Sequence, residues 1–394
     1  MIEIDSLRCT GCGACVQRCP RQCIHWVEGE LGHLLPRIDT ERCIDCGFCD
    51  SVCPIGKETV QPPHQKAYAG VNRSHAVRMD STSGGFFTAL AELVLGGGGV
   101  VYGCAFGENF RAEHIRVDRP EELYRLRGSK YLQSSTGTAF RDAEKDLKEG
   151  KTVLFTGTPC QIAGLKHFLR RSYESLITAD LVCHGVGSQA YFDRYLDFVT
   201  EKYGAVRQLH FRDKAFAGWS CGGMISYVPK TDGVSDRCRH YYDYNHYYYY
   251  YFLHGDIYRD SCYSCPYASL NRPGDFTMGD FWGVEKCGLP LSTREGCSLV
   301  LANTPRGQAI LSELQDTLQL EEVTLEQACR GNAQLSHPSC RSVIRQRLAE
   351  EYETMSGRDM DRAFRRNNRK AILKHRIKAL IPYSLRVRIR KIMK

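Results

Sequence analysis

Eight cysteines in the first 53 residues of this 394-residue chain fall into two copies of one spacing. Each copy reads C-x2-C-x2-C-x3-C-P, and the two sets are Cys9, Cys12, Cys15 and Cys19, and Cys43, Cys46, Cys49 and Cys53. Soft thiolate ligands at this spacing select iron–sulfur clusters over hard metal ions. The pattern therefore predicts a segment that stores and transfers single electrons.

The position of the fourth cysteine in each copy predicts which thiols share a cluster. Three cysteines of a copy lie on one short loop that can reach three irons of a cubane, whereas the fourth, before Pro20 or Pro54, points away. We expect one [4Fe–4S] cluster on Cys9, Cys12, Cys15 and Cys53, and the other on Cys43, Cys46, Cys49 and Cys19. Zinc and disulfides are the alternatives, but a zinc site needs only two C-x2-C halves.

Four cysteines farther along the chain are enough to ligate a third cluster. Cys160 and Cys183 each follow a predicted strand, and parallel strands place such residues at one edge of a sheet. Cys262 and Cys265 add a C-x2-C pair. From spacing alone, the alternative that Cys160 and Cys183 are buried core thiols stays open.

A Ser-Thr-Ser-Gly-Gly run at residues 81–85 precedes a predicted helix. Hydroxyls and free backbone N–H groups at a helix start can hold a phosphate. The same residues also suit an ordinary helix N-cap followed by a flexible glycine pair. Residues 128–131, Gly-Ser-Lys-Tyr, add a cation and a ring that can stack on an isoalloxazine.

Alternating strands and helices must position these groups. The sequence predicts a helix from Phe86 and a strand over 100–106, then strands over 152–156 and 176–182 that lead into helices over 161–169 and 190–202. Residues 140–149 read as an exposed charged helix, and residues 231–233 read as a hairpin turn. The predicted fold class is α/β, with a ferredoxin-like two-cluster domain before an α/β body of parallel strand–helix units.

We expect four segments along the chain. Residues 1–60 form the ferredoxin-type domain, residues 61–150 and 151–345 form the two parts of the α/β body, and residues 346–394 form a basic tail. The body parts are expected to carry the phosphate-binding run and the third cysteine set, respectively.

The cysteine content and the first residues of the chain indicate the cellular compartment in which the protein works. The chain holds twenty cysteines, and its start, MIEIDSLRC, has neither the basic nor the apolar region of a secretion signal. We expect the protein to be located in the reducing cytoplasm, where its thiols bind metal rather than form disulfides. The most apolar stretch, residues 89–106, is interrupted by Glu92 and four glycines, so no membrane-spanning helix is expected.

The net charge of +8 comes from one end of the chain. Residues 362–394 hold thirteen Lys and Arg and no Asp or Glu, and these alternate with apolar residues. Such a segment suits peripheral binding to an anionic membrane surface at the inner face of the membrane. A solvated end is the alternative, and nucleic-acid binding is a weaker one.

Eight tyrosines crowd residues 241–251 without any Arg or Lys among them. Aromatic rings that bind nucleic acid are interleaved with cations, so no nucleic-acid partner is expected. We expect these rings to stack inside a wall of the protein or in a contact between the protomers of a homo-oligomer.

Several short motifs follow one another along the chain, in the order STSGG, GSKYxQS, GTPCQIAGLK, CHG, CxxC and R-x-x-D-x-x-x-GDFWG. In this order they resemble the coenzyme F420 hydrogenase/dehydrogenase beta-subunit family over about residues 1–300, including the ferredoxin fused at the front of many bacterial members. The resemblance implies an iron–sulfur flavoprotein that carries FAD. Arg272, Asp275, Asp280 and Trp282 match the late motif, but the resemblance implies no role for them and no catalytic residue.

Carried onto this sequence, the resemblance implies two sets of cofactor residues. It places the third [4Fe–4S] cluster on Cys160, Cys183, Cys262 and Cys265. It places FAD on Arg78, Ser81, Thr82, Ser83, Gly84, Gly85, Lys130, Tyr131, Gln133 and Ser134.

Together these patterns predict an Fe–S/FAD-dependent oxidoreductase that passes electrons from its ferredoxin clusters through FAD to a substrate or a deazaflavin-like acceptor. The expected partner is a redox protein such as ferredoxin. Bacterial members with this layout are linked to polysaccharide biosynthesis, which implies a small-molecule or glycan-related substrate. The alternative is a non-catalytic electron-transfer component of a larger redox complex.

Overall fold

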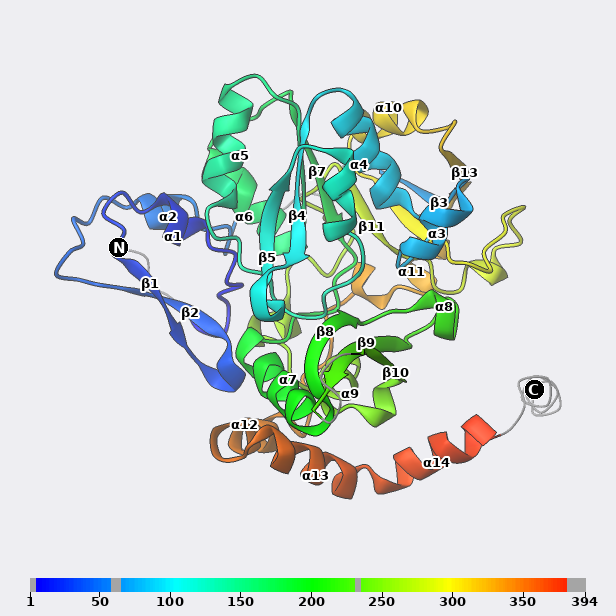
Figure 1. The fold of residues 1–394 in the computed structure, drawn as a ribbon. Helices are drawn as coiled ribbons and strands as arrows, with labels where there is room; N and C mark the ends of the chain where they lie inside the picture. The colour runs from blue at the N-terminus through cyan, green and yellow to red at the C-terminus, as the bar shows by residue number, and fades with distance from the viewer. Residues whose placement is uncertain (1–4, 58–64, 231–234, 381–394) are drawn as a thin grey trace.

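The computed structural model describes residues 5–57, 65–230 and 235–380 (Figure 1). Its N-terminal domain contains α1 (Ala14–Arg18), β1 (Ile24–Glu28), β2 (Leu34–Ile38) and α2 (Phe48–Ser51). β1 and β2 pair antiparallel, with Ile24 opposite Ile38. Each cysteine loop turns into its short helix through a left-handed glycine, Gly13 at φ 83° and Gly47 at φ 70°, so the two sequence copies fold alike.

An eight-stranded sheet forms the centre of the body, in the order β13-β3-β12-β11-β7-β6-β4-β5. Its strands are β3 (Lys66–Asn72), β4 (Val100–Phe106), β5 (Ala112–Val117), β6 (Val153–Gly157), β7 (Leu176–Leu181), β11 (Phe276–Asp280), β12 (Ser298–Ala302) and β13 (Leu318–Val323). The four central strands, β11, β7, β6 and β4, run parallel, and antiparallel strands flank them on both sides. Because the sheet takes strands from both sides of residue 150, residues 61–150 and 151–345 build one body.

Helices cover both faces of this sheet (Figure 1). They are α3 (His75–Asp80), α4 (Phe86–Gly96), α5 (Ala139–Lys148), α6 (Pro159–Leu169), α10 (Pro305–Glu313) and α11 (Leu325–Arg330). Two further helices lie apart from this sheet, α7 (Gln189–Tyr203) on the smaller sheet described below and α8 (Lys214–Ala217) beside α3. In β6, Leu154 packs into a core with α4 and α10, whereas Phe155 packs into a core with α5 and α6. The predicted α/β fold with parallel strand–helix units is therefore confirmed.

The helix predicted as exposed over 140–149 is half buried, because Phe140 and Leu147 of α5 pack against the sheet. The same core contains Ala14 of α1 and Val52, so the ferredoxin-type domain is joined to the body by a continuous apolar contact. The charged residues of α5 lie on its outer side, and their number in the sequence is the reason that the whole helix was expected to be exposed.

A second, three-stranded antiparallel sheet contains β8 (Gly204–His210), β9 (Gly223–Pro229) and β10 (Arg237–Tyr241). The hairpin turn predicted at residues 231–233 lies outside the described residues. The tyrosine-rich segment forms α9 (Tyr247–Leu253), and Tyr247, Tyr248 and Tyr249 are buried against α7. The rings thus form a wall inside the molecule, which is one of the two arrangements that the sequence predicted.

Three helices end the described chain: α12 (Arg345–Thr354), α13 (Gly357–Asn367) and α14 (Arg369–Leu380). Leu348 of α12 and Phe364 of α13 are fully buried beneath α7 and α9. Residues up to 367 therefore belong to the body, although the sequence predicted a tail from 346. α14 follows them along the lower edge of the molecule (Figure 1) and still contacts the body through the buried Ile372 and through His375, whose ring stacks on Tyr244 at 4.7 Å. Leu373 and Ile377 of α14 are exposed.

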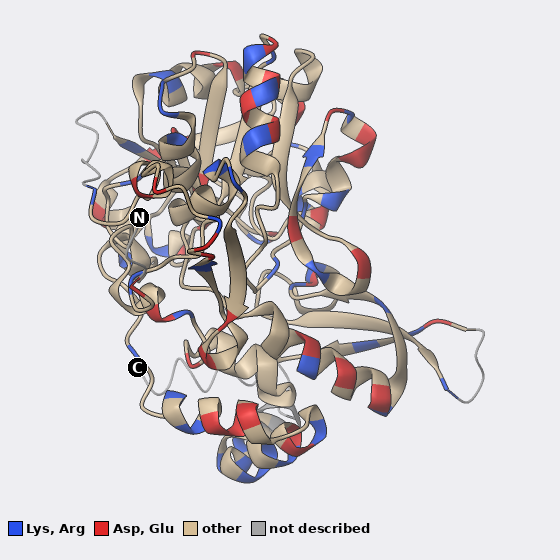
Figure 2. Ribbon diagram, turned by 90° about the vertical axis from the view of Figure 1, so that its left-hand side faces the viewer, with Lys and Arg blue, Asp and Glu red and all other residues tan. Residues whose placement is uncertain are grey.

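The surface carries charges of both signs, while the strands of the central sheet are largely free of them (Figure 2). Among the described helices, none has both the length and the apolar character that crossing a bilayer requires.

Candidate redox site

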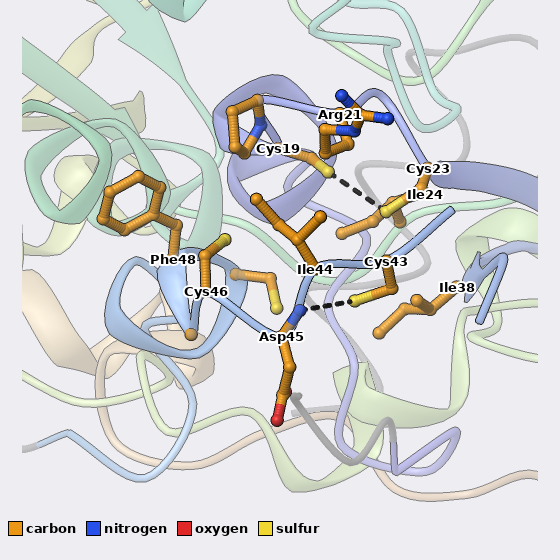
Figure 3. Close-up of a pocket in the computed structure, with 13 residues that line it drawn as sticks. Cys19, Arg21, Cys23, Ile24, Ile38, Cys43, Ile44, Asp45, Cys46 and Phe48 are labelled. Carbon is orange, nitrogen blue, oxygen red and sulfur yellow. Dashed lines mark hydrogen bonds between the residues drawn. The ribbon is translucent and has the colours of Figure 1, made fainter. Parts of the chain in front are cut away.

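Four thiols at the outer end of the ferredoxin-type domain line one pocket. Cys43, Cys46 and Cys49 come from the second cysteine loop, and Cys19 comes from the first (Figure 3). Cys46 is exposed, so this set reaches the protein surface. A fifth thiol, Cys23, lies with its Sγ 3.4 Å from Sγ of Cys19. We refer to Cys19, Cys43, Cys46 and Cys49 as the outer set.

The other four thiols of this domain face the body. Cys15 is within electrostatic reach of both Cys9 and Cys53, and Cys12 is within reach of Cys9 and Cys15. Burial, reinforced by these neighbouring thiols, raises the pKa of Cys15 to about 12. We refer to Cys9, Cys12, Cys15 and Cys53 as the inner set. The structure thus places Cys19 with the thiols of the second loop and Cys53 with those of the first.

The four body cysteines gather at the carboxyl edge of the parallel strands. Cys160 begins α6 directly after β6, and Cys183 follows β7. Cys183 is within electrostatic reach of Cys160, Cys262 and Cys265. Burial and these neighbouring thiols raise the pKa of Cys262 to about 12 and that of Cys265 to about 11. We refer to these four residues as the body set.

The inner set and the body set are adjacent. Cys12 is within electrostatic reach of Cys160, and its Sγ lies against α6, since a Cβ on Gly164 would come within 2.9 Å of it. The buried ring of Tyr267 is close to thiols of both sets. The sets therefore follow one another in the order outer, inner, body.

The chemistry of these thiols fits iron–sulfur ligation. All twenty cysteines are free in the structure, so none of the sets is used for disulfides. Buried thiols with raised pKa values become thiolates when a metal core supplies the compensating charge. Among the described residues, no three His, Cys, Asp or Glu side chains converge closely enough for a single metal ion. The four thiols of the outer set instead line one pocket, as ligands of a cubane do.

A cavity of about 410 Å³ opens beside the body set. Its floor is formed by the carboxyl ends of β6, β7 and β11, and Cys183 lies in its wall. Open α/β sheets bind ligands at this edge, and the volume is typical of a small-molecule or cofactor site. The cavity also has aromatic walls, among them Tyr131, Phe252, Tyr258 and Trp282.

Seven of the ten residues predicted to hold FAD line this cavity: Ser81, Thr82, Ser83, Gly85, Lys130, Tyr131 and Ser134. The run at 81–85 comes between α3 and α4 and is joined to residues 128–131 by a hydrogen bond from Ser129 N to Thr82 Oγ1 (3.2 Å). Two N–H groups at the start of α4, those of Gly84 and Phe86, already donate to Ser298 Oγ. The hydroxyls of Ser81 and Ser83 are engaged with Val77 O and Ser298 Oγ, whereas the Thr82 hydroxyl only accepts and keeps its own hydrogen for a ligand.

The other three predicted residues have different surroundings. Arg78 pairs with Glu295 at 2.8 Å. Gly84 packs on β3, where a Cβ would lie 2.2 Å from Gly70 O. Gln133 donates to the carbonyl oxygens of Thr10 and Gly11, and so links the body to the inner cysteine loop.

Sequence reasoning missed Arg212, which lines the cavity with a side chain only 3 % exposed. Its Nη1 pairs with Asp280 Oδ2 at 2.8 Å, and the guanidinium lies over the Trp282 ring. Its Nε and Nη2 are buried without a hydrogen-bond partner. A single arginine after β8 belongs to no motif, so nothing in the sequence marked it.

Sequence comparisons match two parts of the chain to known families. Residues 8–65 match the family described as 4Fe-4S dicluster domain, and residues 150–328 match the family described as the C terminus of the beta subunit of coenzyme F420 hydrogenase/dehydrogenase. The chain is thus similar to a 4Fe-4S dicluster domain in its first part and to the C terminus of this beta subunit in a later part, and neither match spans half of it. The two similarities together support an iron–sulfur electron-transfer function of the oxidoreductase type.

Among solved structures, the chain is similar to one from the F420-reducing [NiFe] hydrogenase complex of Methanosarcina barkeri in its xenon derivative. The identity is 15 %, the TM-score is 0.44, and the alignment covers 77 % of this chain and 91 % of that one. The comparison with curated proteins gave no match.

Proposed function

We propose that this protein is an FAD-dependent oxidoreductase with three [4Fe–4S] clusters, in which electrons pass from the outer set through the inner and body sets to the cavity. The observation that carries the proposal is the position of Cys183, which belongs both to the body set and to the cavity wall. A cluster on the body set therefore borders any flavin bound in the cavity.

The residues of the cavity suit a flavin. The Thr82 hydroxyl, which accepts from Ser129, offers a donor for phosphate, and Tyr131 offers a ring for stacking that is itself stacked on Phe252 at 4.8 Å. FAD, when bound, exchanges two electrons with a substrate and single electrons with a cluster. The protein's part is to hold the ring beside Cys183 and to keep bulk water from it.

The surface at the outer set suits a redox protein such as ferredoxin. Ile44 and Phe48 beside the exposed Cys46 are themselves exposed, and Arg18 and Arg170 lie over the Phe48 ring at 5.8 Å. An apolar contact flanked by arginines favours a partner with an acidic surface around its own cluster. As the acceptor we propose a small molecule, either deazaflavin-like or glycan-related, which places the enzyme in polysaccharide biosynthesis in the second case.

Iron counting tests the body cluster. The full-length chain, reconstituted anaerobically with iron, sulfide and FAD, should hold about twelve irons, four for each cubane. Cys262→Ala should lower this to about eight, whereas Cys340→Ser, at an exposed thiol outside the three sets, should not change it. A wild-type count of about eight irons would contradict the third cluster.

The same preparation separates the enzyme from a non-catalytic electron carrier. After desalting, an enzyme of the proposed kind keeps one flavin per chain, which bleaches when a reductant is added. Clusters that are reduced while no flavin is retained would favour the alternative, an electron-transfer component of a larger complex.

A further inference from the structure

Arg259 is a buried cation that forms no ion pair with a carboxylate in the described part of the chain. The residue is 3 % exposed. Its guanidinium donates to Gln133 Oε1 at 2.8 Å, to Leu34 O at 2.7 Å and to Cys9 O at 3.4 Å, and all three acceptors are neutral. The neighbouring Asp260 pairs instead with Arg341 and Arg345.

The groups around this guanidinium are thiols from both domains. Cys9 of the inner set and Cys160 and Cys262 of the body set are within electrostatic reach of it. The inner cysteine loop packs directly on it, since a Cβ on Gly11 would lie 2.8 Å from Nη2. Burial lowers the pKa of Arg259, and the three thiols and, after them, the Asp260 carboxylate act in the opposite direction.

A buried charge is costly unless an opposite charge compensates it. Four thiolates outweigh the positive charge of an iron–sulfide core, so a ligated cluster is a net anion, and its reduction adds another negative charge. A cation nearby stabilises the reduced form more than the oxidised form, which raises the reduction potential of the cluster. Bound clusters on both sides would supply the counter-charge that Arg259 lacks.

We propose that Arg259 is the shared counter-ion of the inner cluster and the body cluster and raises the reduction potentials of both relative to the outer cluster. For the body cluster, this proposal rests on the proposed function. For the inner cluster it does not, because that cluster belongs to the matched dicluster domain. Arg259 is a positioning residue in this role, because it favours the movement of electrons inward without touching a substrate.

An EPR-monitored redox titration of the full-length reconstituted chain tests this proposal. In Arg259→Gln, the ratio of reduced to oxidised inner cluster at a fixed ambient potential should fall about tenfold, which equals about 59 mV for a one-electron couple. The outer cluster should keep its potential. Arg259→Lys retains the charge and should recover most of the shift. If Arg259→Gln does not fold, Arg259→Met fills the same space without the charge.

Arg345 offers a matched control. It is 1 % exposed, donates to Tyr258 O at 2.6 Å and joins the same two domains, but Glu30 and Asp260 compensate its charge. Arg345→Gln should leave every potential unchanged. The proposal is overturned if the uncharged Arg259 variants keep the wild-type potentials, or if Arg345→Gln shifts them equally.

Iron content distinguishes this outcome from a failure of the proposed function. A wild-type chain with about eight irons has no body cluster, yet its inner cluster still reports the effect of Arg259.

Discussion

At the residue scale, the unpartnered donors of Arg212 predict where a ligand is recognised. Buried N–H groups that lack an acceptor are destabilising, and a bound oxygen would satisfy them. Arg212 Nε and Nη2 line the cavity in this state, next to the ring of Trp282. We expect them to meet an oxygen of the flavin, either on its phosphates or on its ring.

Arg212→Gln should therefore weaken FAD binding by roughly tenfold to a hundredfold, because a hydrogen bond to a charged group contributes about 1.5–3 kcal/mol. Fluorescence titration of the flavin-free, cluster-loaded chain measures this, and riboflavin as a second ligand separates ring contacts from phosphate contacts. Arg116→Gln is the control, since Arg116 pairs with Asp146 and does not line the cavity. Unchanged FAD affinity in Arg212→Gln would place the ligand elsewhere.

At the element scale, the packing of the 81–85 run on the sheet determines the shape of the cavity. A Cβ at Gly84 would lie 2.2 Å from Gly70 O and 2.5 Å from Ser298 N, and neither backbone atom can move without displacing β3 or β12. This contact with the sheet, rather than a contact with a ligand, explains why residue 84 is a glycine.

Gly84→Ala should therefore displace the start of α4, lower the thermal midpoint by several degrees and abolish flavin retention. Gly96→Ala serves as the comparison, because a Cβ there meets nothing within 4 Å and alanine favours the helix. Differential scanning fluorimetry and the flavin content of both variants test this. A Gly84→Ala protein that binds flavin normally would show that the run tolerates displacement.

Elements were predictable from the sequence where their signals are local. The thiol spacing, the strand–helix units around Cys160 and Cys183, and the helix from Phe86 depend on neighbouring residues, and the structure has each of them. The antiparallel strands β3, β12 and β13 lie far apart in the chain, so no local pattern could join them. Arg212 and Arg259 are single residues whose importance comes only from what the fold places around them.

At the scale of the whole molecule, α14 contacts the body through the buried Ile372, while its Leu373 and Ile377 are exposed. We propose that this helix and the basic residues after it bind an anionic membrane surface, which would place the enzyme on the inner face of the membrane. Electrostatic attraction of this kind weakens as the salt concentration rises.

Deletion of residues 376–394 should abolish co-sedimentation with phosphatidylserine vesicles, while the full chain binds them at low salt and is released at high salt. Phosphatidylcholine vesicles are the control for charge. The cut must follow His375, because Ile372 is buried in the same core as Phe364 and the His375 ring stacks on Tyr244, so an earlier cut would disturb the body. Equal binding by the shortened chain would exclude a membrane role for this segment.

The contacts made by α12 have a consequence for assembly. Tyr352 donates to Glu28 at 2.6 Å and Arg345 pairs with Glu30, so residues late in the chain close over a domain that is synthesised before them. Domains generally fold in order of synthesis, from the N-terminal side. The inner thiols, which α6 and Tyr267 cover in the finished protein, are then open to cluster-delivery proteins until these later segments have been made, and α12 closes over the hairpin last. Cluster insertion would thus be a step of biogenesis with a time limit set by translation.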